Sequence, residues 1–222
     1  MGDRQAKTAL YDGFAVVAQA LASGRRAELV ELLAQGERSV EDAAAEIGQS
    51  VANTSQHLRV LARAGLATSR RDGNRVLYGL AGKGVEALWE ALRAVAAEHV
   101  AGLDRLASDY LGDRAGLEQV GRHELARRLD EDDLVVWDVR PPAEFAAGHL
   151  PGAVSVPPGE VRRRLRDLPD GAEVIAYCRG PFCVFADDAV RELTRHDHPA
   201  MRLEDGFPEW RRAGLPVAVG GE

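Results

Sequence analysis

Apolar residues recur every three or four positions through much of the first 111 residues, a spacing that is typical of amphipathic helices. The spacing predicts helices over residues 8–23, 25–34, 40–47 and 51–64. Ser39 and Ser50 precede the last two, where a serine side chain caps the first turn, and Gly48 and Gly65 end them. Two short helices joined by a glycine-containing turn predict a helix-turn-helix.

The second helix of this pair is predicted to bury Val51, Leu58 and Leu61. Its outward face is polar and carries Asn53, Gln56, His57 and Arg59. Amide, imidazole and guanidinium groups bind base edges and phosphates. We therefore interpret this helix as a DNA recognition helix and these four residues as candidate DNA contacts.

Two strands, residues 67–71 and 75–80, are predicted around Asp72-Gly73-Asn74, because an Asp-Gly pair between two such runs favours a hairpin. The hairpin carries Arg70, Arg71 and Arg75. A basic hairpin directly after a recognition helix is typical of the wing of a winged helix, and we expect its arginines to hold the DNA backbone. The alternative is a plain three-helix domain with a solvated arginine cluster.

Residues 83–111 follow one continuous helical pattern with an apolar stripe along it. A helix of this length is too long to be covered by so small a domain. We therefore predict that part of the stripe packs against a second copy of the chain. A homodimer would also suit paired DNA half-sites.

The pattern changes after residues 112–121, a polar stretch that contains glycine. Short apolar strands then alternate with helices. The strands are predicted at residues 134–137, 173–177 and 200–203, with a turn and a further strand within 148–156, and the helices at 123–129, 142–147, 158–165, 184–195 and 206–213. This alternation predicts an α/β domain with a mainly parallel sheet. The expected division is a mainly α winged helix-turn-helix domain at residues 1–112 and the α/β domain at 117–220.

Both cysteines of the chain, Cys178 and Cys183, lie in one six-residue loop between a predicted strand and a predicted helix. Helix N-termini favour negative charge, so a thiol placed there deprotonates more easily, and the thiolate is the nucleophile. Arg179 and Gly180, together with Pro181, are unsuited to a packed core. We predict that Arg179 and Gly180 belong to the catalytic loop, where the Arg179 charge favours the thiolate of Cys178. The loop therefore indicates an activated cysteine with a second cysteine nearby; the alternative is two buried core cysteines that happen to be close.

The charge of the chain is unevenly placed. Residues 1–100 hold 12 Lys and Arg against 12 Asp and Glu, whereas residues 101–222 hold 16 against 23, so the net charge of −7 belongs to the second half. The neutral first half remains compatible with DNA. We find no apolar run of membrane-spanning length and no secretory signal, which predicts a cytoplasmic protein without membrane contact.

Three segments of the second half resemble the signature segments of single-domain rhodaneses. They are DVRPPAEFAAGHLPGA at residues 138–153, YCRGPFC at 177–183 and EDGFPEWRRAGLPV at 204–217. Residues 39–80, with TSQHL at 54–58 as the most characteristic part, resemble the winged helix of ArsR-type repressors. The whole chain thus resembles an ArsR-type regulator fused to a rhodanese.

The rhodanese resemblance implies that Cys178 carries a persulfide, and the six-residue loop suits sulfur transfer rather than phosphatase chemistry. A cysteine at the sixth position departs from the usual pattern and favours a dithiol that closes, with Cys183 as the resolving thiol. Asp138 and Arg140 match the Asp-Val-Arg segment, and we interpret them as loop support. His149 is interpreted as structural.

The ArsR resemblance is informative by what is missing. Metal-sensing members carry cysteines on the first helix of the helix-turn-helix, and residues 40–47 have none. His99, beside Glu98, and the group His196-Asp197-His198 are typical of surface positions. We predict no metal site and no cofactor. Thiol sensing would have to be done by the rhodanese half.

The leading hypothesis is a homodimeric transcriptional regulator, a repressor, that binds a double-stranded DNA operator and senses or handles reactive sulfur through Cys178 and Cys183. The sulfur species would be thiosulfate, polysulfide or persulfide. The rival hypothesis is a sulfurtransferase with a persulfide intermediate on Cys178. A third retains the rhodanese fold as an inert interaction module.

Overall fold

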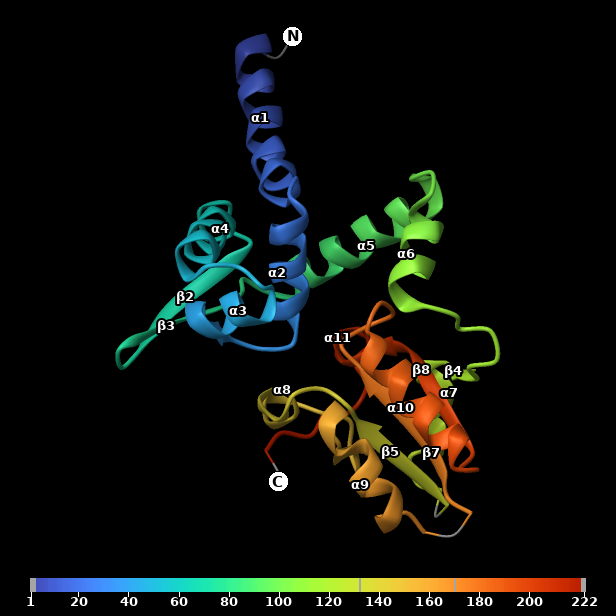
Figure 1. Ribbon diagram of the computed structural model, residues 1–222. Coiled ribbons are helices and arrows are strands. Elements are labelled where there is room, and N and C mark those ends of the chain that lie inside the picture. The colour runs from blue at the N-terminus through green and yellow to red at the C-terminus, as the bar shows by residue number, and fades with distance from the viewer. Residues whose placement is uncertain (1–2, 132, 170, 221–222) are drawn as a thin grey trace. The chain divides into compact units, whose positions relative to one another are not determined.

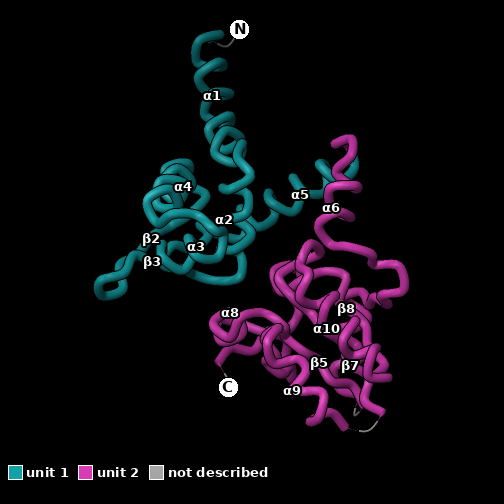
Figure 2. The backbone as a smooth tube through the Cα atoms, in the orientation of Figure 1, with its two compact units in different colours: residues 1–98 teal, residues 99–222 magenta. Residues whose placement is uncertain are grey.

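The computed structural model describes residues 3–131, 133–169 and 171–220. The chain divides into two compact units, Met1–Glu98 and His99–Glu222 (Figure 2). Each unit has a hydrophobic core of its own. Within the described residues, no helix combines the length and the apolar character that crossing a bilayer requires.

The first unit is a helical domain with a small antiparallel sheet of order β1-β3-β2 (Figure 1). Its elements are α1 (Arg4–Leu21), α2 (Gly24–Ala34), β1 (Arg38–Ser39), α3 (Val40–Glu46), α4 (Val51–Arg63), β2 (Ala67–Asp72), β3 (Arg75–Leu80) and α5 (Lys83–His99). The core gathers Leu29, Leu33, Leu58 and Leu61, all almost completely buried. The helix pair and the hairpin predicted from the sequence are confirmed.

The caps of the helix-turn-helix are also confirmed. The Ser39 hydroxyl oxygen accepts a hydrogen bond from the backbone N–H of Asp42 at 3.1 Å, and Ser50 accepts one from Asn53 at 3.3 Å. The prediction for Val51 is wrong, because its side chain is 48% exposed. Val51 is the first residue of α4, beyond the edge of the core, and the inward face begins one turn later at the buried Thr54.

The second unit is built on a parallel five-stranded sheet of order β4-β8-β7-β5-β6 (Figure 1). Its strands are β4 (Gln119–Val120), β5 (Leu134–Asp138), β6 (Val154–Ser155), β7 (Glu173–Cys178) and β8 (Ala200–Gly206). Its α-helices are α6 (Leu103–Leu111), α7 (Arg122–Arg128), α8 (Pro142–Ala147), α9 (Val161–Arg164), α10 (Val184–Arg195) and α11 (Phe207–Arg212). The α/β fold class expected from the sequence is confirmed.

Both faces of the sheet are buried, as a parallel sheet requires. Along β7, Val174 and Ala176 pack into one core together with α10, while Ile175 and Tyr177 pack into the other together with α11. Successive side chains of a strand point to opposite faces, which places them alternately in the two cores. β7 is the middle strand of the sheet, so its last residue, Cys178, lies at the centre of one sheet edge.

Residues 83–111 are two helices rather than the single helix predicted. α5 ends at His99, and α6 begins after Gly102, whose φ of 78° lies in the left-handed region. Glycine adopts this conformation without steric cost, so the chain turns there although the apolar spacing continues. The helix predicted at 158–165 is also interrupted: α9 is flanked by 3₁₀ turns at Pro158–Glu160 and Leu165–Asp167.

Two short strands were not predicted from the sequence. β1 pairs with β3, and β4 pairs with β8 although it lies within the polar stretch expected to separate the domains. Each has only two residues, too few to show the alternation that identifies a strand.

Candidate functional site

The cysteine loop runs from the end of β7 to the start of α10. Cys178 is the last residue of β7 and is 1% exposed, and Cys183 occupies the N-cap position of α10. The two are joined by a disulfide, with Cα atoms 6.2 Å apart. In such sheets, sites lie beyond the carboxyl ends of the strands, and this loop occupies that position.

Arg179, the residue after Cys178, is held by a buried carboxylate. Its Nε lies 3.1 Å from both carboxylate oxygens of Glu144, and its Nη2 lies 2.7 Å from Oε1. The Glu144 side chain, on α8, is completely buried. A bidentate pair of this kind fixes the guanidinium group and offsets its charge, so Arg179 acts chiefly as an anchor between α8 and the loop.

The loop backbone also packs closely against the end of β8. A Cβ atom on Gly206 would lie 2.3 Å from the carbonyl carbon of Arg179 and 2.3 Å from the backbone nitrogen of Gly180. No side chain fits between these two stretches of backbone. Gly206 therefore sets how near β8 approaches the cysteine loop, and Gly180 lies buried at this contact.

Asp138 and Arg140 form a buried ion pair at the end of β5. Both side chains are completely buried, and the Arg140 Nη2 lies 2.5 Å from Asp138 Oδ2 and donates to the Gly148 carbonyl at 2.7 Å. Burial lowers the pKa of Arg140, but the hydrogen bonds and charge of Asp138 outweigh it, and the net shift is upward. The pair fixes the backbone around it.

Tyr177 connects this ion pair to the cysteine loop. Its hydroxyl group donates to Asp138 Oδ2 at 2.5 Å and accepts from the backbone N–H of Leu150 at 3.1 Å. Burial, and next the negative charge of Asp138, raise the pKa of Tyr177 well above its ordinary value. Since Tyr177 directly precedes Cys178, the network holds the strand end from which the loop departs.

His149 has structural partners of its own. Its ring stacks on Phe145 with centroids 3.8 Å apart, and its Nδ1 lies 2.9 Å from the Phe145 carbonyl oxygen. In the part of the chain that the structure describes, no group of three or more His, Cys, Asp or Glu side chains is arranged to hold a metal ion.

Three residues that hold the loop were not predicted from the sequence: Glu144, Tyr177 and Arg114. Glu144 and Tyr177 lie inside the rhodanese-like segments, and a buried carboxylate and a buried phenol require partners, which is the signal that could have identified them. Arg114 lies in the stretch expected to be a boundary, and only the structure shows that it contacts the loop.

The polar face of α4 carries the predicted DNA contacts. Gln56 and Arg59 are exposed, whereas His57 is half-buried and Asn53 donates to the Gln49 side chain at 2.9 Å. Arg59 Nε also lies 3.2 Å from the Ser55 carbonyl oxygen. Gln56 and Arg59 are thus the most accessible of the four.

The three arginines of the hairpin differ in their surroundings. Arg71 and Arg75 are exposed near its tip. Arg70 pairs with Glu37, with Nη2 2.6 Å from Oε2, and this hydrogen-bonded contact raises the pKa of Arg70. An exposed pair of this kind is weak, so Arg70 remains able to exchange Glu37 for a phosphate.

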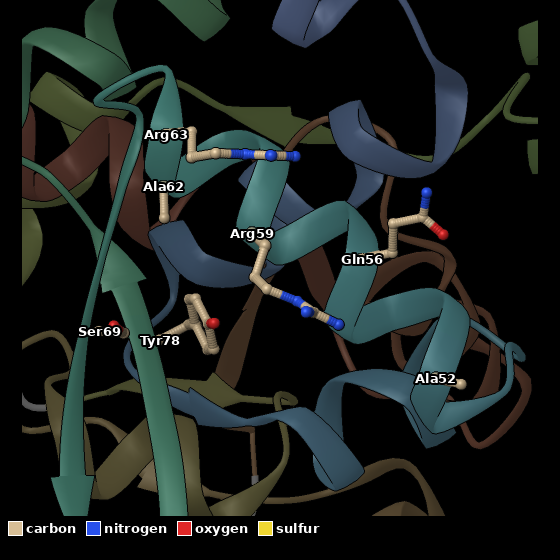
Figure 3. A pocket seen from close by; sticks show the side chains of 7 residues that line it. All are labelled: Ala52, Gln56, Arg59, Ala62, Arg63, Ser69 and Tyr78. Atoms are coloured by element: carbon tan, nitrogen blue, oxygen red, sulfur yellow. The ribbon is translucent and has the colours of Figure 1, made fainter.

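A hollow of about 610 Å³ lies between α4 and the hairpin (Figure 3). It is lined by Ala52, Gln56, Arg59, Ala62, Arg63, Ser69 and Tyr78. Arg63 is not among the candidate DNA contacts predicted from the sequence. It lies one turn after Arg59, so the basic surface of α4 extends to the end of this helix.

These two sites and folds define a class of protein: a transcriptional regulator with an ArsR-type helix-turn-helix and a rhodanese-like domain. Residues 23–69 match the family model described as the bacterial regulatory protein, arsR family, and residues 122–213 match the rhodanese-like domain. The resemblances drawn from the sequence are confirmed.

The chain belongs to the family of the HTH-type transcriptional regulator Rv0324 of Mycobacterium tuberculosis, with which it shares 42% identity over 99% of this chain and 96% of that protein. A sulfurtransferase of Allochromatium vinosum is 29% identical over 46% of this chain and 96% of its own length. Among solved structures, the homodimeric winged helix-turn-helix domain of a possible ArsR-family regulator from Mycobacterium bovis is 42% identical and covers 45% of this chain and 93% of its own, with a TM-score of 0.42.

Proposed function

We propose that this regulator binds a DNA operator as a homodimer and that reactive sulfur changes its affinity through Cys178 and Cys183. The observation that carries the proposal is the disulfide between these two residues, the only cysteines of the chain, inside a rhodanese-like loop. Both cysteines lie in the rhodanese-like domain and none lies in the helix-turn-helix domain. The rhodanese-like domain is therefore the proposed sensor, and the helix-turn-helix domain is the proposed DNA-binding part. The proposed location is the cytoplasm, where the operator is.

The chemistry starts from the dithiol form. The Cys178 thiolate attacks the terminal sulfur of a persulfide, R–S–SH, which releases R–S⁻ and leaves Cys178 as a persulfide. The Cys183 thiolate then attacks the sulfur bonded to the Cys178 Cβ, forms the disulfide and expels HS⁻. The two thiols are oxidised by two electrons, and the donated sulfur is reduced to hydrosulfide.

On the DNA side, α4 is the proposed recognition helix. Gln56 and Arg59 are its proposed base and phosphate contacts, helped by Asn53 and His57. The wing arginines Arg70, Arg71 and Arg75 are proposed to hold the backbone. Their exposure on the hairpin, whose Ser69 and Tyr78 line the hollow together with residues of α4, supports this assignment.

The proposed dimer interface combines α1 and α5. Both helices expose large apolar side chains: Leu10, Tyr11, Phe14 and Val16 on α1, and Leu88, Leu92 and Val95 on α5. Burying so many apolar groups against a second copy removes them from water, which favours association.

Operator titrations test the proposal. Reduced protein, polysulfide-treated protein and a Cys178→Ser variant are compared on one labelled operator. Treatment is expected to weaken binding by about 5–150-fold, an ordinary allosteric coupling, and to leave Cys178→Ser unchanged. Equal affinities for the treated and reduced protein would refute sensing through this loop. Mass spectrometry of Cys183→Ser should find a persulfide on Cys178.

The second candidate function is sulfur transfer. It is favoured by the intact six-residue loop and by the match of residues 122–213 to the rhodanese-like domain. A thiosulfate or persulfide transfer assay on the same preparation separates the two functions. Sustained turnover together with operator binding that ignores the thiol state would favour the enzyme.

A further inference from the structure

Arg114, in the segment between α6 and β4, contacts the cysteine loop directly. Its Nη1 donates to the Pro181 carbonyl oxygen at 2.8 Å, and its Nε lies 2.6 Å from Asp187 Oδ2. Pro181 lies between the two cysteines, and Asp187 is in the first turn of α10, directly behind Cys183. One guanidinium group thus holds both the middle of the loop and the helix that the loop enters.

The neighbouring backbone is fastened to the same helix. Arg191 of α10 donates from Nη2 to the Asp113 carbonyl at 2.8 Å. Leu117 packs against the core that contains Cys178. The segment that follows α6 is therefore not a free tether, because side-chain contacts tie it to α10 and to the loop.

The Asp187 carboxylate is completely buried and forms ion pairs with two arginines. Arg202 on β8 places its Nε 3.0 Å from Asp187 Oδ1, while Arg114 occupies the other oxygen. Burial, and next the charge of Arg114, lower the pKa of Arg202. Removing one partner of a buried charge is costly, so Asp187 keeps Arg114 in place when the loop changes.

We propose that Arg114 transmits the redox state of the cysteine pair to the segment that joins α6 to the parallel sheet, on the side of the chain that leads back to the first unit. This inference rests on the proposed function and names the residue through which it operates. Reduction replaces a covalent link between Cys178 and Cys183 by two separate thiols, so the loop around Pro181 gains freedom. Since Asp187 fixes one edge of the Arg114 guanidinium, a shift of the Pro181 carbonyl either breaks its bond to Nη1 or moves the backbone that carries Arg114.

The test uses the full chain in two states. A dithiol reductant converts the disulfide into two thiols and is itself oxidised to a cyclic disulfide, and protein treated with polysulfide after removal of the reductant is the oxidised reference. Operator affinity and hydrogen exchange of residues 111–120 are measured for the wild type, Arg114→Gln and Arg114→Lys. Arg128→Gln is the matched control, because Arg128 is similarly exposed and also binds a carboxylate, Glu173, at the opposite end of β7.

In the wild type, reduction is expected to change operator affinity at least about fivefold and to speed exchange at residues 111–120. Arg114→Gln should reduce the affinity ratio to less than about twofold and make exchange equal in both states, whereas Arg128→Gln should keep both responses. Arg114→Lys, which retains the charge but not the forked geometry, should lie between them.

The failures can be told apart. A wild type whose affinity ignores the thiol state refutes the proposed function, while a redox-dependent exchange at residues 111–120 that requires Arg114 would still stand on its own. An affinity ratio that survives intact in Arg114→Gln overturns the inference alone. Equal losses in Arg114→Gln and Arg128→Gln also overturn it, because the effect would then follow from general destabilisation.

Discussion

The buried hydroxyl group of Tyr177, next to the cysteine loop, makes the stability of the fold depend on pH. Its pKa is raised, so the folded protein keeps this proton at a pH where the unfolded chain loses it, near 10. The stabilisation is complete below that pH and is lost as the pH rises through the folded-state value.

We therefore expect Tyr177 to stay protonated in native protein above pH ~10. The Tyr177 phenol should ionise at a higher pH in native protein than in the unfolded chain, as followed by the phenolate absorbance of the wild type against Tyr177→Phe. Tyr177→Phe should lower the free energy of unfolding by about 1.5–3 kcal/mol, because the hydrogen bond is made to a charged carboxylate. A Tyr177→Phe titration curve that has lost an ionisation step below pH ~10 would contradict the assignment.

Gly206 is the second decisive single position. A methyl group there meets backbone atoms of Arg179 and Gly180 at less than 3 Å, so the cysteine loop has to move. Gly206→Ala should lower the free energy of unfolding by about 1–3 kcal/mol and change the rate at which polysulfide oxidises the thiols. Gly159→Ala, where a methyl group meets nothing within 4 Å, is the control. Identical thiol rates in both variants would refute the close approach.

At the scale of elements, the wing is expected to contribute charge rather than sequence specificity. Arg75→Ala should weaken binding to all DNA sequences similarly and reduce the slope of log K against log salt by about 1. Arg163→Ala removes the same charge from an exposed position in the second unit and should leave the slope unchanged. An unaltered slope for Arg75→Ala would remove Arg75 from the interface.

The exposed apolar faces of α1 and α5 predict the oligomeric state. Replacing Leu88 and Leu92 together by Lys should give monomers in light scattering and weaken operator binding, because charges would have to be buried at the interface. Val219→Lys changes a residue that is 75% exposed in the second unit and should remain dimeric. A dimeric Leu88→Lys, Leu92→Lys protein would place the interface elsewhere.

The elements that the sequence predicted well are those in which local signals agree. α8 and α10 have the predicted bounds, the first opening on prolines and the second directly after a loop with Gly and Pro. The break at Gly102 was missed because the apolar spacing continues across it. Whether a glycine ends a helix depends on packing beyond its neighbours.

The candidate site shows the same limit. The cysteine pair and the Asp138–Arg140 segment could be located from motifs, because they lie close together in the chain. The partners Glu144 and Arg179 are 35 residues apart, and Arg114 and Asp187 are 73 apart. Such pairs depend on the order of the strands in the sheet, which periodicity does not reveal.

At the scale of the whole molecule, the separate cores predict two unfolding transitions in calorimetry. Reduction of the disulfide should lower the free energy of unfolding of the second unit alone, by roughly 2 kcal/mol for a loop of six residues, and so lower the temperature of its transition. Cys178→Ser should show the same lower transition with and without reductant. A reductant effect on both transitions would mean that the two units unfold as one cooperative body.

The fastened segment before β4 also changes where one module ends and the next begins. The match to the rhodanese-like family starts at residue 122, yet β4 completes the sheet, Leu117 packs into its core and Arg114 neutralises a buried carboxylate. A gene fusion cut at residue 122 would transplant a sheet without its edge strand and with Asp187 short of one partner. A segment that recombination can exchange intact therefore begins near Asp113. Its first eight residues, 113–120, have to be transferred together with the cysteine loop that they contact.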